Sequence, residues 1–162
     1  MTTALQSVVP APEATAAAAP APAPLPAARL MAQAAAWLML LALLTGGYVA
    51  LAVTGKIPAN GRDTIGSHLN ALLGTFMLLG VAWTLPMLRY GPVGQRRMAW
   101  AFIVANYANW FFTAVKAWLN VSGVDYTGHG PNDAIFIILN ITVVLPSLAA
   151  TGAWVYGFRR AS

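Results

Sequence analysis

Long apolar stretches alternate with short polar ones along this chain, and the alternation repeats four times. The apolar stretches cover about residues 27–53, 64–88, 97–121 and 132–158. Each is long enough to cross the hydrocarbon layer of a bilayer as an α-helix, which needs about 20 residues. None shows the sustained alternation of apolar and polar residues that is typical of a membrane-spanning strand. The pattern therefore predicts an all-α membrane protein with four transmembrane helices.

The polar connections are short and contain Gly, Pro or Asn, which mark turns: "TGKIPANGRD", "RYGPVGQR" and "SGVDYTGHGP". Short connections make consecutive helices antiparallel neighbours, so we expect an up-down four-helix bundle over residues 27–162. Pro86 and Pro146 should interrupt the second and fourth helices. Residues 1–26 are dominated by Ala and Pro, and this composition predicts a disordered tail because proline stops helices and alanine buries little surface.

Charged residues make up 8% of the chain, with nine Lys and Arg against four Asp and Glu. Cytoplasmic connections of membrane proteins are enriched in Lys and Arg. The first and third connections carry Lys56 and Arg62, whereas the two ends and the second connection carry six arginines. This distribution places both termini in the cytoplasm and predicts a bacterial inner membrane location. The chain has no basic run with interleaved aromatic residues, so nucleic acid is not expected as a partner. The six arginines at the two ends and in the second connection are Arg29, Arg89, Arg96, Arg97, Arg159 and Arg160.

The chain contains no cysteine and two histidines, His68 and His129. Disulfides, thiolate metal sites, iron–sulfur clusters and covalently attached haem are therefore excluded. Two histidines make a multi-histidine zinc site improbable, and no Glu-x-x-His pair supports a di-iron bundle. A haem held by a single histidine, with one open face, stays compatible with this inventory.

Polar residues follow one face of the third and of the fourth predicted helix. At 100° per residue, those of the third lie within about 80° of one another and those of the fourth within about 40°. Such stripes avoid lipid, and they either bind helices together or line a polar interior. The third helix carries Asn106, Asn109, Thr113, Lys116 and Asn120, and the fourth carries Asp133, Asn140, Ser147 and Thr151.

The segment "GSHLNALLG" opens the second helix with a histidine and an asparagine. On an ideal helix His68 shares a face with Thr75, while Asn70 lies about 200° away and shares a face with Gly66. We therefore expect His68 to face the site of chemistry and Asn70 to face a neighbouring subunit.

The motifs "SHLNALLGTF", "YANW" and "AVKAW" resemble those of the hydroxylaminobenzene mutase family, over about residues 30–158. The family consists of small four-helix membrane proteins that rearrange hydroxylaminobenzene to 2-aminophenol. Styrene oxide isomerase is similar in size and layout. The resemblance implies that His68 binds haem b through the iron and that the chain forms a homo-oligomer, with a trimer implied by styrene oxide isomerase.

Residue by residue, His68 matches the family histidine, and Tyr107, Asn109 and Trp110 match the motif of the third helix. The family often has an asparagine six residues after the histidine, where this chain has Gly74.

The expected activity is transfer of a hydroxyl group from nitrogen to a ring carbon of a small aromatic substrate. Tyr107 and Asn109 would orient the reacting atoms, while Trp110 and Phe111 would stack on the aryl ring. In a version without haem, Tyr126 or Asp133 would protonate the leaving hydroxyl. The alternatives are an epoxide isomerase of the styrene oxide type and a non-enzymatic transporter or complex subunit. Further residues expected in the substrate site are Asn70, Asn106 and Thr113.

Overall fold

The computed structural model describes residues 26–159, which form helices and connections without any strand. The predicted tail lies outside the described residues except for Pro26, which begins the first helix. Two short irregular helices, η1 (3₁₀) and η2 (π), interrupt the α-helical segments. The elements are α1 (Pro26–Val53), α2 (Gly61–Thr84), η1 (Leu85–Met87), α3 (Pro92–Leu119), α4 (Gly130–Leu139), η2 (Asn140–Val144) and α5 (Leu145–Gly157).

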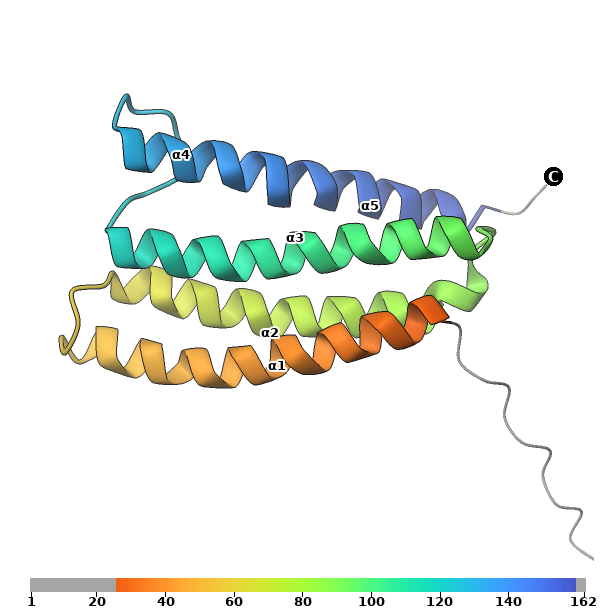
Figure 1. The fold of residues 1–162 in the computed structure, drawn as a ribbon, viewed down its shortest axis with the longest axis horizontal. Helices are drawn as coiled ribbons and strands as arrows, with labels where there is room; N and C mark the ends of the chain where they lie inside the picture. The colour runs from red at the N-terminus through yellow and green to blue at the C-terminus, as the bar shows by residue number, and fades with distance from the viewer. Residues whose placement is uncertain (1–25, 160–162) are drawn as a thin grey trace, which may run out of the picture.

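The helical segments run antiparallel to their neighbours in the chain, as the short connections predict (Figure 1). The start of α1, the connection between α2 and α3, and the end of α5 lie at one end of the molecule (Figure 1). We call this the arginine end, because the described members of the arginine group, Arg29, Arg89, Arg96, Arg97 and Arg159, belong to these segments. The connections from α1 to α2 and from α3 to α4 lie at the opposite end.

Local side-chain chemistry determines where the helices begin and end. The Asn60 side-chain oxygen accepts hydrogen bonds from the backbone N–H groups of Arg62 and Asp63, which caps the start of α2. Pro92 begins α3, where its missing N–H costs nothing, so this helix starts earlier than the predicted residue 97. Asn120 ends α3 in the left-handed conformation, with φ of 51°.

Pro86 and Pro146 both interrupt regular α-helix. Pro86 lies within η1, which follows α2 directly. Pro146 follows the π-helical turn η2, in which the N–H of Leu145 bonds to the carbonyl of Asn140, five residues back. Proline has no N–H to donate to the carbonyl four residues earlier, so the widened turn accommodates the missing bond.

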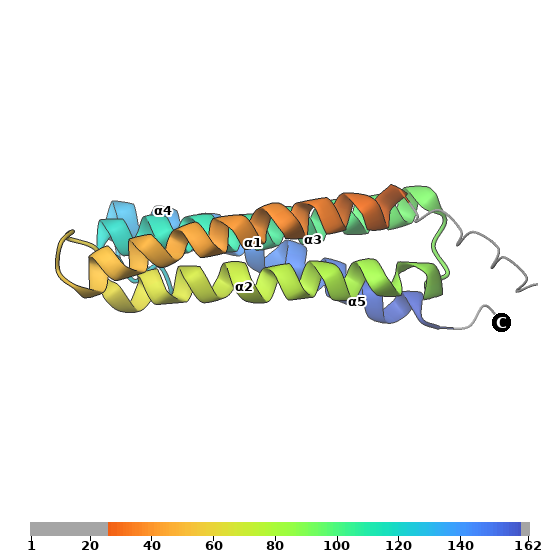
Figure 2. The ribbon, with the colours of Figure 1, turned by 90° about the horizontal axis from the view of Figure 1, so that it is seen from below.

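Helices α1, α2 and α3 pack together around one apolar core, whereas the fourth segment, α4–η2–α5, packs chiefly on α3 (Figures 1 and 2). Its end is tied to the rest at the arginine end, where Tyr90 donates to the Ala153 carbonyl over 2.7 Å and Trp154 donates to Thr84 over 2.9 Å. The arrangement is therefore a three-helix core with a flanking helix. In a bilayer the exposed apolar face of that helix needs no protein cover, because lipid chains solvate it.

Three helical segments of the described chain are long and apolar enough to cross a membrane: α1, α2 with η1, and α4–η2–α5. These segments indicate a membrane protein. The polar stripe and the basic residues Arg96, Arg97 and Lys116 lower the hydropathy of α3, which lies between the other segments (Figure 1). The prediction that α3 crosses the membrane rests on its length and its central position.

Candidate active site

His68 lies on α2 with its ring turned toward α1. Its Nδ1 atom is 2.8 Å from the carbonyl oxygen of Ala42. A carbonyl can only accept a hydrogen bond, so Nδ1 carries the hydrogen and the lone pair of the neutral ring is on Nε2. The ring lies over Gly46, where an added Cβ would be in ordinary van der Waals contact with His68 Cε1, at 3.9 Å. The backbone of α1 thus fixes both the tautomer and the orientation of this half-buried histidine.

A layer of hydrogen bonds joins the three core helices at the level of His68. Ser67, the residue before it, donates to the carbonyl of Trp110 on α3 over 3.0 Å. The Trp110 indole N–H donates to the hydroxyl of Thr45 on α1 over 2.9 Å, and Thr45 donates to the Leu41 carbonyl. These bonds hold Trp110 between α3 and α1 and limit how its ring can turn.

A second polar cluster lies on the other side of α2. The side-chain amide of Asn70 donates to the Asn109 side-chain oxygen over 3.2 Å and to the Thr113 hydroxyl over 3.1 Å. The expectation that Asn70 faces a neighbouring subunit is wrong, because α3 of the same chain covers that face. Gly66 shares the face as predicted, since a Cβ there would lie 3.7 Å from Thr113.

Gly74, at the position where the family often has asparagine, packs tightly against Asn106. A Cβ at residue 74 would lie 2.7 Å from the Asn106 side-chain oxygen and 3.0 Å from Leu38 Cδ2. The Asn106 amide also donates to the Phe102 carbonyl of its own helix over 2.8 Å, which fixes its position. A carboxamide is therefore present beside residue 74, and α3 supplies it instead of α2.

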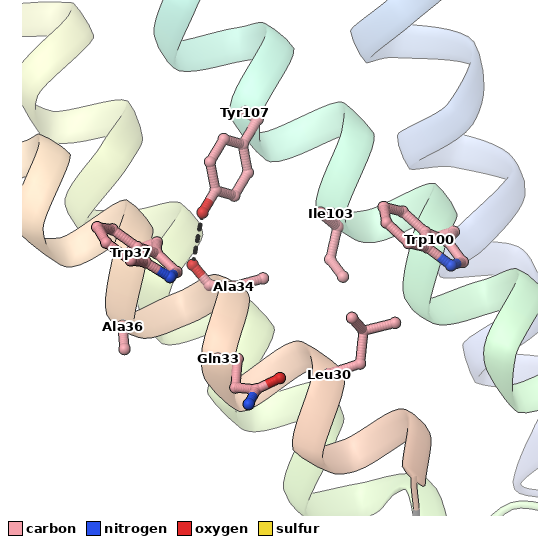
Figure 3. A pocket seen from close by; sticks show the side chains of 8 residues that line it. All are labelled: Leu30, Gln33, Ala34, Ala36, Trp37, Trp100, Ile103 and Tyr107. Carbon is pink, nitrogen blue, oxygen red and sulfur yellow. Dashed lines mark hydrogen bonds between the residues drawn. The ribbon is translucent and has the colours of Figure 1, made fainter.

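Tyr107 and Phe111 point in other directions. The Tyr107 hydroxyl donates to the Ala34 carbonyl of α1 over 2.8 Å, and its ring borders a hollow of about 520 Å³ between α1 and α3 (Figure 3). Phe111 is half exposed and packs against its sequence neighbours Trp110 and Phe112, with ring centres 6.2 and 5.2 Å apart. Phe111 therefore borders the outer surface at the level of Trp110.

Asp133 lies in the first turn of α4, and Tyr126 belongs to the connection between α3 and α4. One Asp133 oxygen accepts from the backbone N–H of Thr127 over 2.8 Å and from the Thr127 hydroxyl over 3.3 Å. Asn132, the residue before Asp133 on α4, accepts a hydrogen bond from the Gly123 N–H and donates one to the Asp125 carbonyl, both in that connection. Tyr126 is 70% exposed, and no hydrogen bond in the described chain joins it or Asp133 to the His68 layer or to the Asn70 cluster.

The sequence-predicted residues therefore fall into several groups. His68 and Trp110 belong to one layer, and Asn70, Asn109 and Thr113 to a cluster on the other side of α2 at a similar level. Asn106 and Tyr107 lie closer to the arginine end. The sequence did not single out Ser67 and Thr45, because small hydroxyl side chains are common in membrane helices and only the packing shows which of them join two helices.

Metal ligation by this site depends on His68 alone. Among residues 26–159 no three His, Cys, Asp or Glu side chains gather into a possible metal cluster. A porphyrin supplies four nitrogen ligands of its own and needs only an axial ligand from the protein. A neutral histidine whose Nδ1–H is held by a backbone carbonyl, leaving the Nε2 lone pair for a metal, meets that need.

The fold and the site define a class of protein: a small helical membrane protein with one oriented histidine and with side-chain amides between its helices. Residues 27–159 match the family model described as styrene oxide isomerase, so the chain belongs to that family of isomerases. A similar protein is hydroxylaminobenzene mutase HabB of Ectopseudomonas oleovorans, which is 31% identical over 144 residues, covering 83% of this chain and 82% of that protein. No solved structure matches the chain.

Proposed function

We propose that the chain is a membrane mutase that converts arylhydroxylamines of the hydroxylaminobenzene type into 2-aminophenols. The N–O bond of the substrate breaks and a C–O bond forms at the neighbouring ring carbon. That carbon loses its hydrogen as a proton and the nitrogen gains one, so the reaction has no net oxidation or reduction. The observation that carries the proposal is the oriented His68 in a chain 31% identical to a mutase of this name.

His68 would hold haem b through Nε2. The donation from Nδ1–H to the Ala42 carbonyl supports this role, because such an outer contact fixes the ring and raises the basicity of the other nitrogen. Bound there, ferric haem would supply a Lewis acid for the substrate oxygen. The membership of the styrene oxide isomerase family favours a homo-oligomer, and we propose a trimer.

The residues of the chain would bind and orient the aromatic substrate. Trp110, held by Thr45, and Phe111 offer aromatic surface for the ring. Asn109 accepts a hydrogen bond from Asn70 on the other side of α2, so it would hold α3 against α2 and position Trp110, the next residue along α3. The apolar helix faces around these groups would keep water from competing for the ring carbon.

A second candidate reaction is the rearrangement of an aryl epoxide to an aldehyde, which the description of the matching family favours. Both reactions move electrons within one substrate and can use the same acid at an oxygen atom. The haem-free route would depend on Asp133 or Tyr126, and the hydrogen bonds that bind Asp133 to Thr127 make it a weaker candidate.

Membranes containing the chain should be supplied separately with hydroxylaminobenzene and with styrene oxide. The proposal predicts formation of 2-aminophenol well above that of control membranes, and little conversion of the epoxide. Conversion of styrene oxide alone would replace the proposed substrate with the second candidate. If neither substrate reacts, although the chain purified from the same membranes retains its helical spectrum, the proposed reaction is wrong.

A further inference from the structure

An apolar groove runs along the outer seam between α1 and α3, starting at the arginine end. It consists of two adjoining hollows of about 460 and 520 Å³, and Leu30 and Trp100 line both of them. Pro26 and Arg96 line the first hollow, and Trp37 lies at the far end of the second (Figure 3). We call this the α1–α3 groove. It lies on a different side of the molecule from the Asn70 cluster.

The length of the α1–α3 groove corresponds to one leaflet of a membrane. Pro26 and Trp37 are 11 positions apart on α1, which is about 16 Å at 1.5 Å per residue. Half of a hydrocarbon layer of roughly 30 Å is about 15 Å. An acyl chain that enters at the arginine end would thus be covered by the groove over the depth of its leaflet.

The charges at the mouth of the groove favour an anionic ligand. Arg96 lines the mouth and is exposed, and the only ion pair among the described residues, Lys116 with Asp63, lies at the opposite end. The described carboxylates Asp63, Asp125 and Asp133 also belong to that opposite end. Basic pockets between transmembrane helices bind anionic lipid headgroups.

Gln33 adds a polar group at an intermediate depth. Its exposed side chain lies in the groove between Leu30 and Trp37 (Figure 3), and it forms no hydrogen bond with another described residue. It is seven positions from Pro26, about 10 Å along α1. A glutamine that faces hydrocarbon without a partner is unfavourable. Helical side chains point toward the helix N-terminus, which for α1 is the arginine end, so the Gln33 amide extends toward the level at which the ester oxygens of a phospholipid would accept its N–H groups (Figure 3).

From these observations we propose that the α1–α3 groove binds an anionic phospholipid, with its phosphate on Arg96, its ester region within reach of the Gln33 amide and one acyl chain running past Trp100 toward Trp37. This lipid is a structural ligand separate from the substrate. Its site does not depend on the reaction proposed above, because none of Arg96, Gln33 and Trp100 is assigned a role in that reaction.

The test uses tryptophan quenching in vesicles by phosphatidylglycerol or phosphatidylcholine with brominated acyl chains. Each protein is measured with and without Trp100→Phe, and the difference isolates the signal from the groove. The unmodified chain should favour brominated phosphatidylglycerol by about fivefold, the effect expected of one cation near a membrane surface. Arg96→Gln should abolish the preference. Arg97→Gln is the matched control, since Arg97 is the next residue but does not line either hollow, and it should keep the preference.

Equal quenching by both lipids in the unmodified chain would overturn the proposal. An equal loss of the preference in the Arg96→Gln and Arg97→Gln proteins would also overturn it, because the preference would then come from a diffuse surface charge. Failure of both lipids to quench Trp100 would mean that another part of the protein or a second copy fills the groove, and would overturn it as well.

Discussion

At the residue scale, the central feature of this chain is a histidine whose Nδ1 atom is held by a backbone carbonyl. The Ala42 carbonyl holds Nδ1–H, so any metal must bind at Nε2. The sequence singled out this histidine as the candidate ligand. It could not predict the tautomer, because the fixing group is a backbone carbonyl 26 residues away.

Replacement of each histidine in turn tests this assignment. His68→Ala should remove the visible absorption band of bound haem and reduce turnover to the control level, because no second histidine lies in a helix. His129→Ala is the matched control: this exposed residue precedes α4 and should leave the spectrum and turnover unchanged. The measurement is the visible spectrum of the detergent-purified protein. A His68→Ala protein with an unchanged haem band would contradict the assignment.

A second prediction concerns Asp133, whose oxygen binds the connection before α4. Asp133→Ala should accelerate amide hydrogen exchange at Thr127, because it removes the acceptor for that N–H. Turnover should stay near that of the unmodified chain. Loss of a general acid would instead lower turnover by about 10²-fold or more, and such a drop would favour the haem-free route.

At the element scale, close contacts between helices depend on single small residues that a hydropathy pattern does not resolve. The sequence located the four helical segments and both proline interruptions, because these follow from run length and from the missing N–H. It treated Gly74 as a missing asparagine, whereas the structure shows that Asn106 fills the space beside it. It also assigned Asn70 to another subunit, because helical angles alone do not say which neighbour covers a face.

Gly74→Ala should therefore destabilise the protein by about 1–3 kcal/mol, the usual cost of overpacking. The added methyl group would displace the Asn106 side chain and press on Leu38. Gly80→Ala, at an open position of the same helix, should be neutral or slightly stabilising. Unfolding in detergent measures both. Adding Asn106→Ala to Gly74→Ala should recover part of the loss, and equal stability of the two glycine variants would contradict the packing.

At the scale of the whole molecule, the chain forms a three-helix core with a flanking helix on α3. The short connections predicted an up-down four-helix bundle, and they do not say how closely the fourth helix packs on each of the others. In a membrane the lipid can cover such a face, so the bundle need not close. The positions of the charges remain the basis for the predicted orientation.

The absence of cysteine from the chain makes that orientation straightforward to test. Single variants Thr54→Cys, Gly91→Cys and Asp125→Cys place a thiol in each of the three connections. A membrane-impermeant thiol reagent applied to intact cells should label residues 54 and 125 and spare residue 91. This result would place the two ends of α3 on opposite sides of the membrane. Labelling of residue 91 with sparing of residue 54 would reverse the orientation, and equal access to residues 91 and 125 would contradict the crossing by α3.

The central claim is that the hydroxyl group moves within one substrate molecule. Hydroxylaminobenzene carrying a heavy oxygen isotope in its hydroxyl group should be incubated with the purified chain in ordinary water, and the 2-aminophenol analysed by mass spectrometry. The account predicts that the product keeps the label, because the apolar surroundings of Trp110 and Phe111 exclude solvent oxygen. Product without the label, or no product from a folded protein with an intact His68, would contradict it.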